Sequence, residues 1–417
     1  MKQSRGLAKV TVTPKAEKSI LSGHPWVYNT EVLRLEPDPS VPFTNGDLVD
    51  VVNAKGSWLG TGFYNEISKI RVRLISRNAN DRFDEAFYER RLRHAVAYRQ
   101  TVMGPDAACC RLIFGEADHF PGLTVDRFGD ILVTQTLSLG MERIKGMLFP
   151  MLYRILNEEE NRVNGLGVRA IYERNDVAIR KLEGLEEGKG FFPLEGVELP
   201  ETTSTTIVEN GITYAVDYEN GQKTGFFLDQ KYNRQAVARL SRGKRVLDCF
   251  THTGSFGLNA AQGGAELVLS VDISESAIEM ARQNACRNGL DDRMEFLAAN
   301  VFDLLPRLEH DPRKFDFIIL DPPAFTKSRQ TVESAARGYK EINLRAMKLL
   351  PRGGYLATCS CSHFMTEERF VKMLHDAARD ACVSLRQIEA RQQSPDHPIL
   401  WNVPETNYLK FYLFQVV

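Results

Sequence analysis

Two cysteines stand close together at the end of a short apolar run. The stretch 353–365 opens with a Gly-Gly turn, continues as a strand-like segment and ends in small polar residues around Cys359 and Cys361. This pattern predicts a buried parallel strand whose carboxyl end faces a cleft, which is where ligands bind in open α/β sheets. A thiolate at that position can act as a nucleophile. A small buried packing residue is the alternative.

A carboxylate follows another predicted strand, in the sequence Asp-Pro-Pro-Ala-Phe at 321–325. The rings of Pro322 and Pro323 fix the backbone, so that the Asp321 carboxylate and nearby carbonyls face the cleft. The ring of Phe325 can stack on a flat base. We therefore expect Asp321 to act in catalysis and the next residues to contact a substrate.

Three further segments predict a nucleoside-containing cofactor. The stretch 246–256 reads as strand, tight turn and helix, and its small residues let backbone N–H groups approach a ligand. It lacks Gly-x-Gly-x-x-Gly and a Lys-Ser/Thr pair, which disfavours dinucleotides and nucleoside triphosphates. Asp272 ends the next strand, where an acid can bind a ribose diol. With the segment 300–303 for adenine, the set predicts S-adenosylmethionine (SAM), bound by Asp248, Phe250, Thr251, Thr253, Gly254, Asp272, Ile273, Asn300, Val301 and Asp321.

Regular alternation of strands and helices from 206 to 417 must position these residues. Strands are expected at 245–248, 267–272, 294–297, 315–320, 355–360 and 408–416, with helices such as 274–288 and 339–350 between them. This order predicts an α/β, doubly wound, Rossmann-like sheet.

The first 80 residues predict a small β-barrel. Several short strands are separated by turn signals between 41 and 74, and the segment holds 11 Lys or Arg against 7 Asp or Glu. Period two places Lys69, Arg71 and Arg73 on one face of a strand, where they could bind a phosphate backbone. A solvated strand face is the alternative.

Residues 81–205 predict an α+β domain with an architectural role. A helix is expected at 83–103, with Arg90, Arg91, Arg93 and Arg99 mostly in solvent. Two strands around a turn at 128–130, a helix at 141–156 and a strand at 168–174 follow. No catalytic triad or metal cluster is readable in this sequence.

Composition is that of a globular protein without a membrane span. The 417 residues are 43% hydrophobic and 26% charged, with a formal net charge of −1. No signal-peptide pattern and no run of about 20 apolar residues is present, so a cytoplasmic protein is expected. The seven cysteines show no metal-ligand spacing, and we expect free thiols and no bound metal.

The motifs together resemble the ribosomal RNA large subunit methyltransferase I family, over essentially the whole chain. The resemblance rests on 223–230 with Asn233-Arg234, the Phe-x-x-Thr-Gly loop at 250–254, Asp-Pro-Pro at 321–323 and Ser-Cys-Ser at 360–362. It implies a PUA-like RNA-binding domain (1–80), a central domain (81–205) and a methyltransferase domain (206–417). It also implies formation of 5-methylcytosine in 23S rRNA. Gln230 and Arg234 would hold the amino-acid end of SAM.

Two departures and two rival functions accompany this resemblance. Asn300 stands where an acid is expected, and Ser255 replaces a loop glycine. Cys361 lies seven residues after Gly354, as in RNA cytosine-5 methyltransferases, so it is the expected nucleophile and Cys359 a packing residue. An RNA guanine N-methyltransferase without a covalent adduct is one alternative, and a noncatalytic SAM-binding assembly factor is another. Ribosomal RNA or an assembling large subunit is the expected partner, and a homodimer is plausible.

Overall fold

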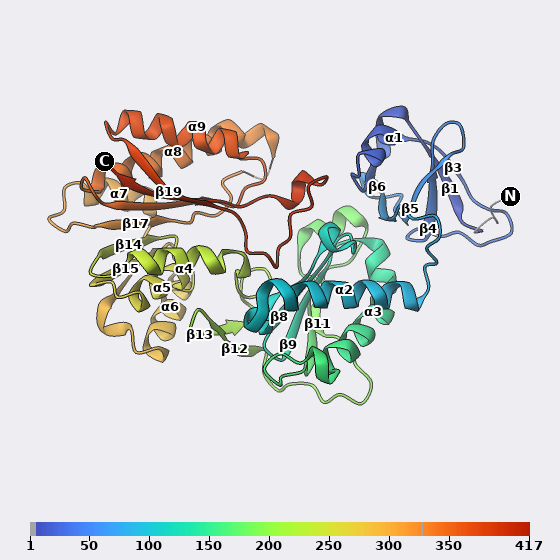
Figure 1. Cartoon of the computed structure of the whole chain (residues 1–417), viewed down its shortest axis with the longest axis horizontal. Coiled ribbons are helices and arrows are strands. Elements are labelled where there is room, and N and C mark those ends of the chain that lie inside the picture. Colours follow the sequence, from blue (N-terminus) through green and yellow to red (C-terminus); the bar gives the residue numbers. More distant parts are fainter. Residues whose placement is uncertain (1–5, 327) are drawn as a thin grey trace. The chain divides into compact units, whose positions relative to one another are not determined.

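The computed structural model describes residues 6–326 and 328–417, and these residues form two compact units (Figure 1). Unit 1 comprises the described part of Met1–Thr206 together with Val216–Leu228 and Pro395–Thr406. Unit 2 comprises Ile207–Ala215, Asp229–Ser394 and Asn407–Val417. The seven-stranded sheet and all predicted cofactor residues belong to unit 2.

The N-terminal part of unit 1 is a curled six-stranded sheet. Its strands pair in the order β2-β6-β5-β4-β1-β3, so that β2 and β3 form its two edges and the sheet is a half-barrel rather than a closed barrel. Buried valines from β1 and β4 and the helix α1 fill its concave side. The elements are β1 (Ala8–Val12), α1 (Pro14–Leu21), β2 (Trp26–Tyr28), β3 (Val32–Glu36), β4 (Leu48–Val52), β5 (Trp58–Tyr64) and β6 (Ile70–Ser76).

The second part of unit 1 is an α+β domain, as the sequence predicts. Its five-stranded sheet has the order β11-β10-β9-β8-β7. β7, β8 and β9 pair antiparallel, whereas β9 and β10 are parallel and connected through α3. The elements are α2 (Glu85–Met103), β7 (Cys109–Phe114), β8 (Leu123–Phe128), β9 (Ile131–Thr136), α3 (Leu139–Asn157), β10 (Ala170–Arg174) and β11 (Lys189–Phe191).

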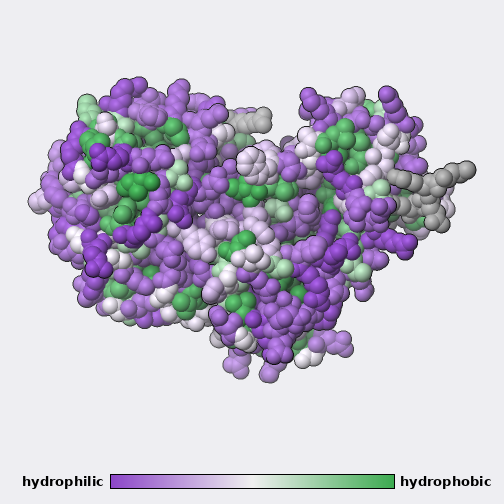
Figure 2. Space-filling model, viewed as in Figure 1, coloured by the Kyte–Doolittle hydropathy of each residue, from purple (hydrophilic) through white to green (hydrophobic). Residues whose placement is uncertain are grey.

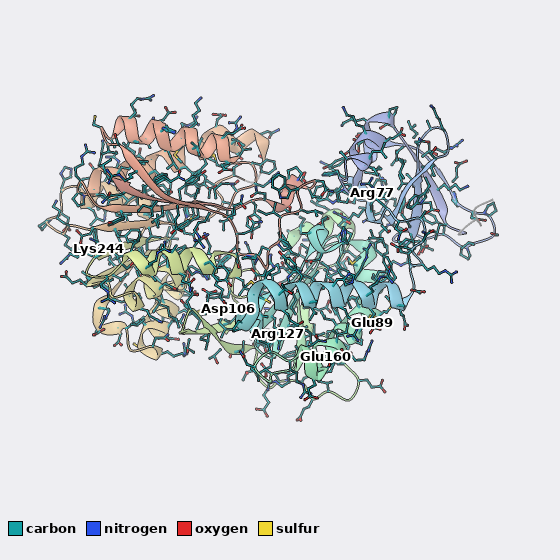
Figure 3. The ribbon with its side chains drawn as sticks, viewed as in Figure 1. Arg77, Glu89, Asp106, Arg127, Glu160 and Lys244 are labelled. Carbon is teal, nitrogen blue, oxygen red and sulfur yellow. The ribbon has the colours of Figure 1, made fainter. Side chains whose placement is uncertain are left out.

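Two arginines of this domain are internal supports. Arg99 was expected in solvent, but its side chain is buried and its guanidinium binds both carboxylate oxygens of Asp118, at 2.5 and 2.7 Å. Arg127, labelled in Figure 3, is also buried and donates to the carbonyls of Gly129 and Leu166. A helical period cannot show that a carboxylate from another segment will draw an arginine inward, which is why the expectation for Arg99 was wrong.

A hairpin precedes the seven-stranded sheet of unit 2. β12 (Ser204–Glu209) and β13 (Ile212–Asp217) are joined by Asn210 and Gly211, whose φ angles are 54° and 79°. Asn-Gly is the pair that best tolerates two left-handed residues, and such a loop matches the twist of its strands. This hairpin was not anticipated from the sequence.

Unit 2 contains the doubly wound sheet that the alternation predicts. Seven strands lie in the order β16-β15-β14-β17-β18-β20-β19, and only β20 runs antiparallel to its neighbours β18 and β19. The elements are α4 (Lys231–Leu240), β14 (Arg245–Cys249), α5 (Ser255–Gln262), β15 (Leu267–Asp272), α6 (Glu275–Arg287), β16 (Met294–Ala298), α7 (Val301–Leu308), β17 (Phe317–Leu320), α8 (Val332–Leu349), β18 (Tyr355–Ser360), α9 (Glu367–Asp380), β19 (Leu385–Arg391) and β20 (Lys410–Val416).

Helices cover both faces of this sheet. α7, α8 and α9 pack on one face, where alternate residues such as Leu247, Ile318, Leu356 and Phe414 form one buried cluster with them. α4, α5 and α6 lie on the opposite face (Figure 1). β14 and β17 are neighbours although β15 and β16 follow β14 in sequence, so the strand order reverses between them. Ligands bind at the carboxyl ends of strands at such a reversal.

The face of the molecule drawn in Figure 2 is mostly polar. Figure 2 shows hydrophilic residues over most of the viewed face, with separate apolar patches between them. Within residues 6–326 and 328–417, none of the helices is both long and apolar enough to span a membrane.

Candidate active site

The loop after β14 has a strained backbone. Phe250 and His252 adopt left-handed conformations, with φ of 64° and 51°, and Gly254 follows at 84°. Non-glycine residues rarely adopt such angles, and at ligand sites the surrounding structure maintains them. Here the N–H of Thr251 donates to Val271 and that of His252 donates to Asp272. The loop is therefore tied to β15 and passes over the carboxyl end of the sheet.

Asp248 is the carboxylate beneath this loop. It is fully buried, and its Oδ2 accepts hydrogen bonds from the Thr251 hydroxyl and from the N–H of Gly257 at 2.8 Å. Burial, together with the charges of Asp321 and Asp272, raises the pKa of Asp248 to about 7. Its Oδ1 and the buried hydroxyl of Thr253 have no hydrogen-bond partner among the described residues. Two buried polar atoms thus remain available to a polar ligand.

Asp272 and Ile273 end the next strand. The two oxygens of Asp272 accept from the N–H groups of His252 and Ser274, at 2.9 and 3.0 Å, which fixes the carboxylate in one orientation. Each oxygen keeps a lone pair for another donor. Ile273 is 72% exposed, an apolar side chain directly beside this acid. This pair suits the ribose and the flat face of a nucleoside.

Asn300 and Val301 begin α7. The side-chain oxygen of Asn300 caps the helix by accepting from the N–H of Phe302 at 3.0 Å, and Val301 is buried. The amide oxygen of Asn300, in the segment expected to bind adenine, therefore already has one partner. Its second lone pair and the side-chain NH₂ remain the groups with which Asn300 can meet a base edge.

Asp321 lies directly after β17 and is held by Gln230, the residue that precedes α4. Its Oδ1 accepts from Gln230 Nε2 at 3.0 Å, and Asn233 in turn donates to Gln230 Oε1 at 2.6 Å. Burial and the nearby charge of Asp229 raise the pKa of Asp321 to about 6, although the charge of Arg234 opposes this. The carboxyl group is thus much closer to neutrality at pH 7 than an ordinary aspartate.

Arg234 and Gln230 are both engaged within the protein. Arg234 is buried, and its Nη1 pairs with Glu209 Oε1 at 2.6 Å. Gln230 bridges Asn233 and Asp321. These contacts give Gln230 and Asn233 a supporting role at Asp321, and binding of the amino-acid end of SAM by Gln230 or Arg234 remains a prediction.

Aromatic packing holds the Asp-Pro-Pro-Ala-Phe loop. The ring centroid of Phe325 lies 4.6 Å from that of Tyr339. It lies 5.7 Å from the ring centroid of Phe302 and 6.3 Å from that of Phe250. Pro322 is buried, whereas Pro323 is exposed. The structure therefore gives Phe325 an anchoring role in the loop, and its stacking on a substrate base remains a prediction.

The two cysteines have different surroundings. Cys359 lies in β18 and is fully buried, in hydrogen-bonding contact with Asp321 and Gln230, and burial raises the pKa of its thiol well above the ordinary value. Cys361 lies just beyond the end of β18 at Ser360 and is only half-buried. Strand alternation therefore does not extend to Cys361, and of these two thiols it is the accessible one.

The turn that carries Cys361 is supported by residues that the sequence did not reveal. The Ser360 hydroxyl donates to Tyr339 at 3.1 Å, and the Ser362 hydroxyl donates to the carbonyl of Thr326 at 2.9 Å. Lys410 Nζ donates to the carbonyl of Ser362 at 2.6 Å. Only the pairing of β18 with β20 brings Lys410 here, and no local pattern indicates that pairing.

The basic face of β6 is partly used internally. Arg73 is 12% exposed, and its guanidinium pairs with Glu183 at 2.8 Å and Glu116 at 3.3 Å. Arg71 donates to the carbonyl of Asn65. Lys69 is exposed. Of these three cations, Lys69 is thus the one most open to a phosphate, and the charge of Arg73 is neutralised by two carboxylates.

Comparisons with known proteins identify the family. Residues 194–415 match the model for S-adenosylmethionine-dependent methyltransferases, and residues 10–77 match a PUA-like domain. Ribosomal RNA large subunit methyltransferase I of Klebsiella pneumoniae strain 342 is 41% identical over 403 residues, covering 96% of each chain. The protein of that name from Escherichia coli O127:H6 is also 41% identical, covering 96% of this chain and 97% of its own. The chain belongs to the ribosomal RNA large subunit methyltransferase I family.

Solved structures show the same fold as this family member. A Streptococcus mutans protein assigned as a SAM-dependent methyltransferase has a TM-score of 0.77 and 22% identity, covering 98% of this chain and 99% of its own. A protein assigned as a methyltransferase and complexed with SAH has a TM-score of 0.79 and 22% identity, with the same coverage.

The expected cofactor, SAM, is therefore confirmed, and the site fits it. The orphaned Oδ1 of Asp248 and hydroxyl of Thr253 provide buried polar atoms, while Asp272 and Ile273 provide an acid and an apolar face. Gly257 lacks a side chain where a Cβ would lie 2.5 Å from Ser270 Oγ and 2.9 Å from Asp248 Oδ2, so the helix start can sit close to the carboxylate.

Proposed function

We propose that this methyltransferase forms 5-methylcytosine in 23S ribosomal RNA through a covalent adduct with Cys361. The observation that carries the proposal is the position of this thiol. It is half-buried at the ligand end of β18. The Ser362 hydroxyl ties its turn to the carbonyl of Thr326, which belongs to the loop that follows Asp321. A cysteine is needed for C5 chemistry because C5 of cytosine is a poor nucleophile, whereas an exocyclic amine already carries a lone pair.

The Cys361 thiolate would start the reaction by adding to C6 of the base, which gives C5 the character of an enamine carbon. Bound SAM supplies an electrophilic methyl group. After C5 has gained the methyl group, its proton leaves to a base, the C5–C6 double bond re-forms and the thiolate is released. We assign the removal of that proton to no residue.

Asp321 would assist the addition at the opposite edge of the ring. In its protonated form the carboxyl group donates a hydrogen bond to N3 and withdraws electrons from C6. The pKa of about 6, caused first by burial, supports this role because a measurable fraction stays protonated near neutral pH. Gln230 holds the carboxyl group in place.

The PUA-like sheet would grip RNA outside the reacting base. A base in folded RNA must leave its stack to enter such a pocket, so contacts to the surrounding backbone are required. Lys69, just before β6, and Arg71 in β6 are the cations that we propose for this role. The relatives named above are large-subunit rRNA methyltransferases, which supports rRNA, free or in an assembling subunit, as the substrate.

Mass-spectrometric mapping of rRNA from a deletion strain, with and without restored protein, tests this function. We expect one 5-methylcytosine of 23S rRNA to disappear and to return with the wild-type chain but not with Cys361→Ala. Loss of a methylated guanine instead would favour an N-methyltransferase. An unchanged set of modified bases, together with tight SAM binding, would favour a noncatalytic assembly factor.

A further inference from the structure

Lys410 is a buried cation at the ligand end of the sheet. It begins β20 and lies opposite Ser360, the last residue of β18. Strand alternation places its side chain on the face of Tyr412 and Phe414, which pack against α8 and α9. Lys410 is only 7% exposed. Lysine is rarely buried to this degree, so this position calls for a partner or a function.

The ammonium group is held by backbone carbonyls. Nζ donates to Ser362 at 2.6 Å and to Tyr408 at 2.8 Å, and an ammonium group has three protons to donate. The carbonyl of Ser362 belongs to the residue that follows Cys361. Lys410 therefore both fixes the turn and brings a positive charge close to the thiol.

Charged and titratable groups approach this turn from every element packed on it. Asp321 lies after β17, Tyr339 comes from α8, Glu367 comes from α9 and Cys359 lies in β18. Burial is the main cause of the raised pKa of Tyr339 and of Cys359, and the charge of Cys361 adds to both shifts, so these groups and Cys361 influence one another. Of these groups, Asp321 and Glu367 can carry a negative charge, which disfavours a nearby thiolate, whereas Tyr339 and Cys359 are neutral at pH 7.

Protonation of Lys410 is consistent with a role as the balancing charge. Burial lowers the pKa of Lys410 to about 8, while the charges of Cys361 and Glu367 raise it. At pH 7 the ammonium form therefore still predominates. Glu367 is itself held by a hydrogen bond from the Tyr412 hydroxyl at 2.7 Å.

We propose that Lys410 is a positioning residue for Cys361, which fixes the Ser360–Ser362 turn and stabilises the Cys361 thiolate with its positive charge. This inference rests on the proposed role of Cys361. On ionisation the thiol proton passes to solvent, and no bond to Lys410 forms. A cation near a cysteine lowers the thiol pKa and increases the thiolate fraction.

Alkylation of the free full-length protein with iodoacetamide tests this role without RNA or SAM. Mass spectrometry of the Cys361 peptide gives its alkylation rate from pH 5.5 to 9.5, and the exposed thiols of Cys286 and Cys382 serve as internal references. We expect the wild-type Cys361 profile to have a lower pH midpoint than these references. In Lys410→Met the midpoint should rise by about one unit, which slows alkylation at pH 7 about tenfold. Lys410→Arg should keep a low midpoint because arginine stays charged.

The pH profile of Cys361 alkylation distinguishes an electrostatic role of Lys410 from a purely structural one. If Lys410 only shaped the turn, Lys410→Met would change the maximal alkylation rate but leave the midpoint unchanged, and this result would overturn the inference. A wild-type Cys361 midpoint no lower than that of Cys286 would also overturn it, even if the variant failed to fold. Failure of the cytosine proposal would appear separately, as absent adduct with rRNA despite a low midpoint.

Discussion

The raised pKa of Asp321 suits its proposed catalytic role but lowers the stability of the folded protein at neutral pH. With a pKa of about 6, about one molecule in ten carries the protonated form at pH 7, against fewer than about one in a thousand for an ordinary aspartate. A raised carboxyl pKa means that folding favours the protonated form. The stability from this group is therefore present below the unfolded pKa of 3.8 and is lost as pH rises through about 6.

Asp321→Asn should separate the two effects. The amide can donate a hydrogen bond but cannot give a proton, so we expect adduct formation to slow by about 100-fold. Because the variant has no buried carboxylate, urea unfolding at pH 8 should show it at least as stable as wild type, with a smaller advantage at pH 4. A variant that is fully active, or clearly less stable at pH 8, would argue against this role for Asp321.

At the scale of elements, the first turn of α5 can lie close to Asp248 because Gly257 has no side chain. In Gly257→Ala the new Cβ would meet Ser270 Oγ and Asp248 Oδ2 at 2.5 and 2.9 Å, so the carboxylate must move. We expect SAM to bind at least about tenfold more weakly, a loss of about 1.4 kcal/mol measured by calorimetry.

Gly146→Ala is the matched control for that substitution. Gly146 also lies within a helix, α3, but a Cβ there meets nothing within 4 Å. Alanine should leave SAM binding unchanged and raise the unfolding temperature slightly, because glycine destabilises helix interiors. Equal SAM affinity in both variants would show that the close contact between α5 and Asp248 is not needed for SAM binding.

Most strands of unit 2 could be predicted from the sequence because short apolar segments mark them. The parallel strand β17 is a continuous apolar run, and β14 and β15 are mostly apolar, while the polar residues at and after the strand ends mark the ligand edge. β19 was missed because its residues are mostly exposed and mixed in character. Lys410 was missed as a site residue because its approach to Cys361 depends on an antiparallel pairing between segments about 50 positions apart.

At the scale of the whole molecule, the basic strand face has an internal and an external part. Arg73 is paired with two carboxylates, so its removal should lower the stability of unit 1 rather than RNA affinity. Pairing of this kind depends on distant residues such as Glu183 and is invisible to strand periodicity. The division into domains at about 80 and 205 remains a prediction, since the described residues cluster into two units.

Lys69→Glu is expected to weaken binding of an rRNA fragment and to reduce the slope of log affinity against log salt by about 1. The reason is the loss of one phosphate contact from the exposed cation that precedes β6. Lys55→Glu provides the same charge change on another exposed lysine of the same domain and should have a smaller effect. If both variants bind alike in fluorescence anisotropy titrations, Lys69 makes no specific contact.

The most direct test of the central claim is trapping with rRNA that contains 5-fluorocytosine. Fluorine at C5 cannot leave as a proton does, so a methylated adduct should persist through denaturing electrophoresis. We predict this complex for the wild type and for Cys359→Ala, and none for Cys361→Ala with SAM binding intact. Methylation of cytosine by Cys361→Ala, or an adduct that depends on Cys359 instead, would contradict the account.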